Sequence, residues 1–199
     1  MFRKLFFLGV CVYGYWTVLS HPLLALKMES TYGGKYEFLT MLGLYLTILT
    51  LIASVISNFI PIKGMVSFLL ALSFPVEGVV TVFYWVLYFY DPSLLHMGEI
   101  RISLPTNLAI HLIPGIALWT EFLTMKDFRH SRYHIYYSGL LCAMYYWWVH
   151  FLFEKNDQWV YPLLGVLSPS DRFLFFIASA LFNTALYMFG LFLHRRINY

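Results

Sequence analysis

The side chains best suited to chemistry in this sequence include a threonine, Thr40, inside a long apolar segment. Small and hydroxyl residues recur there every three or four positions. That spacing places them on one stripe of a helix, where they serve either close packing of membrane helices or a function. In both cases Thr40 faces the interior of a helical bundle. The members of the stripe are Tyr36, Thr40, Gly43, Thr47, Thr50, Ser54 and Ser57.

A histidine, His111, lies in another apolar segment, four residues after Asn107 and therefore on the same helical face. Pro114 follows and is expected to loosen the helical hydrogen bonding and bend the helix. His111 has two interpretations. It either hydrogen-bonds a neighbouring helix, or it acts as a general base or proton relay, since neutral imidazole is a common base near neutral pH.

Three further ionisable residues fall inside or beside apolar segments, where charge is unfavourable and often functional. Glu77 lies in the middle of its segment and is interpreted as a protonated structural acid, a proton relay or the partner of His111. His150 either supports the site around His111 or anchors its helix at the membrane interface. Glu121 lies near the end of its segment and is expected to reach the interface.

The composition indicates an integral membrane protein formed by one domain, residues 1–199. Hydrophobic residues make up 60% of the chain and charged residues 12%, against about 45–50% and about 25% in ordinary globular proteins. The net charge is +3, and the basic residues are scattered. A nucleic-acid partner is therefore not expected, because binding phosphates requires a contiguous basic surface.

The apolar runs predict an all-α, polytopic membrane bundle with six transmembrane helices, since a span needs about 20 apolar residues. Gly- and Pro-containing or charged stretches separate the runs. The predicted spans are Leu5–Leu26, Tyr36–Ile60, Met65–Tyr90, Leu104–Met125, Ile135–Phe153 and Phe173–Leu193.

Lysine and arginine predict that both termini are cytoplasmic, because cytoplasmic loops carry the excess of these residues. The side with the termini would hold Arg3, Lys4, Lys63, Lys126, Arg129, Arg132, Arg195 and Arg196, and the other side Lys27, Lys35, Arg101, Lys155 and Arg172. With this orientation Thr40 and His111 both enter from the far side. At about 1.5 Å per residue they lie about 6 and 10 Å deep, so they can meet if their helices are neighbours.

Signatures of other site types are missing from the sequence. It contains no G-x-S-x-G, no H-E-x-x-H, no phosphate-binding loop and no Cys/His cluster. Cys11 and Cys142 fall in apolar runs and are interpreted as buried hydrophobic residues. We expect neither a metal nor a cofactor.

Four blocks of the sequence resemble one family, the androgen-induced, FAR-17a-like membrane proteins. The first, Thr31–Thr40 (TYGGKYEFLT), is similar to the family stretch T-Y-G-G-x-x-x-F-L-T. The others follow in the same order, and the resemblance covers most of the chain from Thr31 on. They are Phe74-Pro75-Val76 leading to Tyr84-Trp85, Asn107–His111 as N-x-x-x-H, and Trp148-Val149-His150 followed by Trp159–Pro162.

This resemblance implies a multi-pass hydrolase of fatty acid esters of hydroxy fatty acids, with Thr40 as nucleophile and His111 as base. Asn107 is the expected oxyanion donor, and His150, Glu77 and Tyr36 are expected around the substrate. Glu77 departs from the family pattern, in which a small residue follows F-P-V. The expected partners are a fatty acyl ester and the bilayer, in the endoplasmic reticulum or the plasma membrane.

A second class of function stays open beside the enzyme. The chain could be a lipid-binding membrane protein without catalytic activity, or a proton-coupled transporter with Glu77 and His111 as relay groups. Inverted repeats and paired broken helices, which many transporters contain, are not evident in the sequence.

Overall fold

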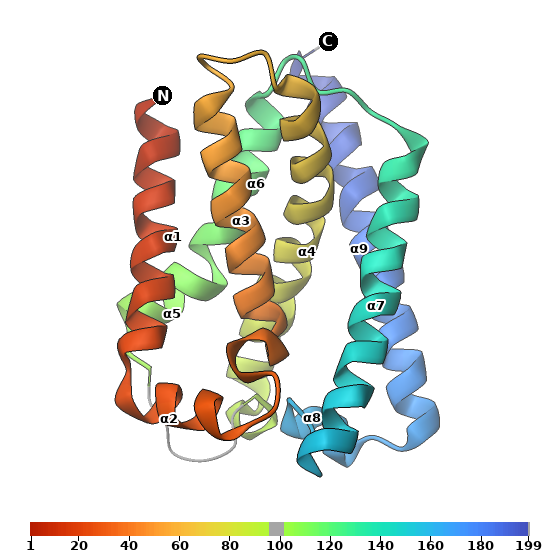
Figure 1. The fold of residues 1–199 in the computed structure, drawn as a ribbon. Helices are drawn as coiled ribbons and strands as arrows, with labels where there is room; N and C mark the ends of the chain where they lie inside the picture. Colours follow the sequence, from red (N-terminus) through yellow and green to blue (C-terminus); the bar gives the residue numbers. More distant parts are fainter. Residues whose placement is uncertain (96–101, 199) are drawn as a thin grey trace.

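A computed structural model describes residues 1–95 and 102–198, and every regular element in these two ranges is helical. The elements form one bundle, shown in Figure 1. In chain order they are α1 (Phe2–Ser20), α2 (Pro22–Ser30), the 3-10 helix η1 (Gly34–Glu37), α3 (Leu39–Ile56), α4 (Lys63–Tyr90), the 3-10 helix η2 (Pro92–Leu94), α5 (Leu104–His111), α6 (Ile113–Thr124), α7 (Arg132–Asn156), α8 (Pro162–Val166) and α9 (Pro169–Asn198).

Helix α4 lies at the centre of the bundle and contacts helices on every side. It packs against α3, α5, α6, α7 and α9, while α1 packs on α3, α5 and α6. The short helix α2 lies across the end opposite the termini (Figure 1). Phe74 of α4 stacks on Phe122 of α6, with ring centroids 4.1 Å apart, and both rings are fully buried. The main core therefore lies where α4, α6 and α9 meet.

Three helices in the described ranges are long and apolar enough to cross a membrane, namely α3, α4 and α9. The pair α1–α2 passes the same test together, although its two helices are bent by 71°. The structure thus provides three to four candidate spans of the six expected from the sequence. An all-helical bundle is confirmed, and the full set of six spans stays a prediction.

Two of the expected spans are interrupted. The segment Leu5–Leu26 bends at His21, because Pro22 begins α2 and has no N–H to continue the preceding ladder. The segment Leu104–Met125 divides at Leu112, whose φ of −125° lies outside the helical range. Pro114 cannot donate to the carbonyl four residues earlier, as its place in the sequence predicts. These two segments are therefore bent or broken helices.

The two termini lie at the same end of the bundle (Figure 1). The connections from α3 to α4 and from α6 to α7 lie at that end as well. The eight basic residues assigned to the side of the termini thus belong to one end of the bundle. Arg101, assigned to the other face, lies outside the described residues. Which face meets the cytoplasm stays a prediction.

Candidate functional site

His111 is the last residue of α5, and its side chain is buried, with 6% exposed. The ring of Tyr84 in α4 lies flat against the imidazole, with 3.3 Å between centroids and 8° between planes. The Tyr84 hydroxyl donates a 2.7 Å hydrogen bond to Oδ1 of Asn107, one turn before His111. The predicted common face of Asn107 and His111 is therefore confirmed, and Tyr84 packs on both. This contact fixes the plane of the imidazole.

Thr40 is the second residue of α3 and is partly buried. The backbone N–H of Leu39, just before it, donates to the hydroxyl of Tyr161 at 2.9 Å and to that of Tyr145 at 3.1 Å. The first N–H groups of a helix have no partner within the helix, so the two tyrosines supply one. Side chains from α7 and from the start of α8 thus hold the turn on which Thr40 lies.

The same turn is held at two more backbone atoms. Nε1 of Trp148 donates to the carbonyl of Tyr36 at 2.9 Å, and the Tyr145 hydroxyl donates to the carbonyl of Glu37 at 3.0 Å. The side chain of Tyr36 is half exposed. Tyr36 therefore contributes its backbone here, whereas the sequence suggested its side chain.

Thr40 and His111 lie on helices that pack against each other, α3 and α5. Within the part of the chain that the structure describes, no hydrogen bond joins the Thr40 hydroxyl to the imidazole. The two helices are neighbours, but the two side chains are not hydrogen-bonded to each other, so a Thr40–His111 catalytic pair stays a prediction. Bringing the two groups into contact would require substrate binding or a bridging water.

Glu77 of α4 is fully buried against α3. Its Oε1 accepts a 3.2 Å hydrogen bond from the Thr47 hydroxyl. The same hydroxyl also donates to the carbonyl of Gly43 at 2.9 Å. A Cβ added at Gly43 would lie 2.5 Å from Oε1. The glycine therefore provides the space that the carboxyl occupies. No ion pair links Glu77 to His111 among the described residues.

His150 faces an aromatic cluster formed by α7 and the segments around α8 and α9. Its Nδ1 lies 2.9 Å from the carbonyl of Tyr146 in its own helix, and Trp159 meets its ring edge-on at 5.3 Å. None of its described contacts reaches Thr40 or His111. His150 is therefore not placed beside the proposed catalytic pair, and its role as an anchor at the membrane interface stays a prediction.

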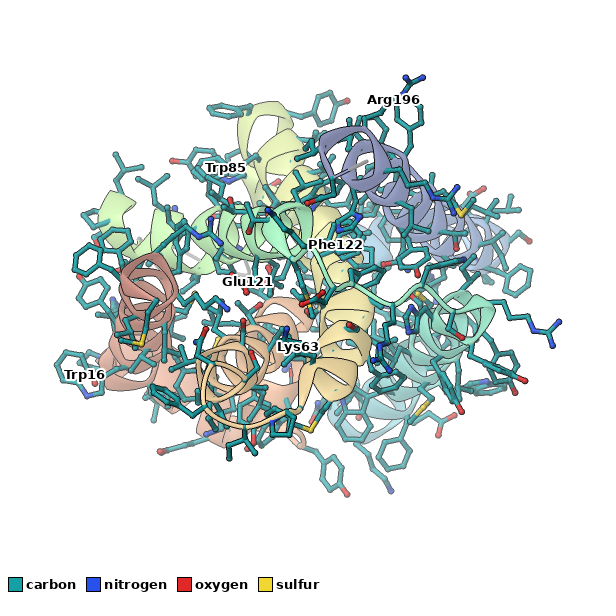
Figure 2. All side chains as sticks on the ribbon, turned by 90° about the horizontal axis from the view of Figure 1, so that it is seen from above. Trp16, Lys63, Trp85, Glu121, Phe122 and Arg196 are labelled. Atoms are coloured by element: carbon teal, nitrogen blue, oxygen red, sulfur yellow. The ribbon has the colours of Figure 1, made fainter. Side chains whose placement is uncertain are left out.

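Glu121 is buried and ion-paired, whereas its position near the end of its apolar segment predicted that it reaches the interface. Its Oε1 lies 2.8 Å from Nζ of Lys4 and accepts a hydrogen bond from the Ser54 hydroxyl. Its Oε2 lies 3.2 Å from a guanidinium nitrogen of Arg3. Seen from the end of the termini, Glu121 lies toward the middle of the bundle with Phe122, while Trp16 and Arg196 lie at its edge (Figure 2). This cluster ties α1 to α3 and α6.

The His130–His134 pair, at helical spacing in the sequence, shares one partner. Nδ1 of His130 and Nδ1 of His134 lie 3.0 and 2.9 Å from the hydroxyl of Tyr187. Across residues 1–95 and 102–198, no group of three or more His, Cys, Asp or Glu side chains is arranged to hold a metal ion.

Helices of membrane-spanning length that enclose a buried imidazole, tyrosine and amide define an α-helical membrane protein with a polar interior site. The chain belongs to the FAR-17a/AIG1-like protein family, whose model matches residues 2–195. This confirms the family suggested by the sequence motifs.

Three relatives show how far the similarity extends. A UPF0641 membrane protein of Schizosaccharomyces pombe is 26% identical over 170 residues, covering 81% of this chain and 75% of its own. The androgen-induced gene 1 protein of Homo sapiens is 26% identical, covering 86% and 81%. The androgen-dependent TFPI-regulating protein of Mus musculus is 24% identical, covering 79% and 75%. No solved structure matches the chain.

Proposed function

We propose that this protein is a multi-pass membrane hydrolase that cleaves fatty acid esters of hydroxy fatty acids. Thr40 is the nucleophile and His111 the general base. The observation that carries this proposal is the buried His111, whose ring is held by Tyr84 and lies one turn from Asn107. Its helix packs on α3, near whose start Thr40 lies. A fixed imidazole beside a hydroxyl-bearing helix suits nucleophilic acyl transfer.

In this reaction His111 takes the proton of the Thr40 hydroxyl while Oγ1 attacks the ester carbonyl carbon. The tetrahedral intermediate collapses as the imidazolium returns the proton to the leaving alkoxide, which departs as the hydroxy fatty acid. Asn107 accepts from Tyr84 through Oδ1, so its Nδ2 is left to donate to the oxyanion. Water then cleaves the acyl-threonine ester and restores the Thr40 hydroxyl.

The surroundings of the site support this substrate class. Apolar helices of membrane-spanning length surround these polar groups, so an ester with long acyl chains would reach them from the bilayer. An apolar enclosure with few polar groups is typical of sites that bind such ligands.

We further propose six spans with both termini in the cytoplasm, in the endoplasmic reticulum or the plasma membrane. Helix α7 has 25 residues, about 37 Å at 1.5 Å per residue, which exceeds the about 30 Å of bilayer hydrocarbon. Its many tyrosines and tryptophans lower its hydropathy but suit membrane interfaces. Helices α5 and α6 together form the other additional span, which is broken at Leu112.

One observation favours the second candidate, a non-catalytic lipid-binding or proton-coupled carrier. Glu77 is a fully buried carboxyl inside a candidate span, and such groups often relay protons in transporters. In that case Glu77→Gln would abolish solute uptake in vesicles, and a fluorophosphonate probe would not label the protein.

A fluorophosphonate probe, which labels activated nucleophilic hydroxyls, tests the enzyme hypothesis. Labelling is expected to disappear in Thr40→Ala and in His111→Ala, with both variants monodisperse and present at wild-type level. Thr50→Ala is the matched control, because it removes a hydroxyl from the same helix that is already bonded to the carbonyl of Leu46. Labelling that persists in Thr40→Ala would exclude Thr40 as the nucleophile.

A further inference from the structure

Two buried oxygens on the inner side of α4 lack a hydrogen-bond partner among the described residues. The first is Oε2 of Glu77, whose other carboxyl oxygen shares the single proton of Thr47 with a backbone carbonyl. The second is Oγ1 of Thr81, one turn further along α4. Residues four apart lie on one helical face, so both side chains project from the same face of α4 into an apolar interior. We call these two side chains the polar strip.

This strip lies next to both helices that carry the proposed catalytic residues. The carboxyl of Glu77 fills the space at Gly43, three residues after Thr40 on α3. The hydroxyl of Thr81 fills the space at Gly115, where an added Cβ would lie 2.7 Å away. Gly115 is four residues after His111, at the start of α6. The strip therefore spans from the α3 turn after Thr40 to the α6 turn after His111.

Unbonded polar atoms in a protein interior are uncommon, because burying one without a partner costs about 1–3 kcal/mol. Ordered water usually supplies the missing bonds, and a buried water makes about three of them. A carboxyl oxygen and a hydroxyl one turn apart offer two of those contacts. The two glycines keep the strip free of the methyl groups that any other residue would add.

We infer that Glu77 and Thr81 hold the water that hydrolyses the acyl-threonine intermediate. This inference rests on the proposed function, since it concerns the second half of that reaction. The water oxygen attacks the acyl carbonyl carbon and its proton passes to His111. The bond between that carbon and Oγ1 of Thr40 breaks, Oγ1 takes the proton from His111, and the fatty acid leaves. An apolar site that excludes bulk water needs such a bound water to complete turnover.

Glu77→Met and Thr81→Val test this role in the full-length protein in detergent micelles or nanodiscs. Three quantities are measured: the rate of fluorophosphonate labelling, the steady-state turnover of a long-chain p-nitrophenyl ester, and the fraction of acylated protein in acid-quenched reactions by intact mass spectrometry. The matched control is Thr50→Val, the same substitution at the α3–α4 interface for a hydroxyl already bonded to protein.

We expect both variants to be labelled at the wild-type rate, because labelling needs Thr40 and His111 but not water. Ester turnover should fall about tenfold, the effect of about one lost hydrogen bond in the transition state. Acyl-enzyme on Thr40 should accumulate in both variants and not in Thr50→Val.

Several results would overturn the inference. They are unchanged turnover, labelling slowed as much as turnover, an effect in only one of the two variants, or an equal effect in Thr50→Val. Failure of the proposed function is a different result, in which the wild type cleaves no ester or Thr40→Ala still becomes labelled or acylated.

Discussion

The close packing of α9 on α4 leads to a quantitative prediction for Gly190→Ala. A Cβ at Gly190 would lie 2.7 and 2.9 Å from two ring carbons of Phe74, and 3.2 Å from Phe122. These two rings are stacked on each other and buried, so neither can move away freely. Overpacking of this kind costs about 1–3 kcal/mol. At about 2–4 °C per kcal/mol for a chain of this size, the steric cost alone lowers the melting temperature by roughly 2–12 °C.

The matched control is Gly139→Ala in α7, where an added Cβ has no atom within 4 Å. Both variants gain the same helix propensity, about 0.5–1 kcal/mol, so their difference isolates the steric term. Thermal unfolding of the purified protein, followed by intrinsic tryptophan fluorescence, measures it. If Gly190→Ala melts at or above the temperature of Gly139→Ala, the packing of α9 against Phe74 is not as described.

Three further predictions follow from individual contacts. Lys4→Met should destabilise the fold by about 1–3 kcal/mol in the same melting assay, because it removes a positive charge that is paired with the buried Glu121 carboxylate. Adding Glu121→Leu should recover part of the lost stability. Tyr161→Phe removes one acceptor from the Leu39 N–H, so hydrogen exchange at that amide should become faster by mass spectrometry. Tyr84→Phe keeps the ring stacked on the imidazole but loses the hydrogen bond to Asn107. Ester turnover should fall about tenfold while fluorophosphonate labelling persists. An unchanged turnover would contradict a role for that hydrogen bond.

Much of the helical architecture could be predicted from the sequence, because long apolar runs determine where membrane helices form. The run Met65–Tyr90 became α4 with almost the same bounds, since Pro75 lies inside the helix without ending it. The break near Pro114 was also predictable, because proline lacks the N–H of a regular helix. The bend at His21 was not predicted although Pro22 carries the same signal, because the apolar run continues on both sides of it.

The residues around the site were only partly predictable. The four-residue spacing of Asn107 and His111 was sufficient to place them on one face. Tyr84 could not be singled out among the aromatic residues of α4, because the rotation of each helix about its axis is set by packing with distant segments. The pairing of Glu121 with Lys4 could not be predicted for the same reason, because it depends on where α1 lies in the bundle.

The break between α5 and α6 has a consequence for how the chain enters the membrane. Pro114 has no N–H to donate, so the carbonyl four residues before it loses its regular partner, and hydrocarbon cannot supply another. Contacts with α1, α3 and α4 surround α5 in the finished bundle, and these helices all precede it in the chain. In the proposed six-span arrangement, stable insertion of residues 104–124 therefore depends on the earlier helices already being in place.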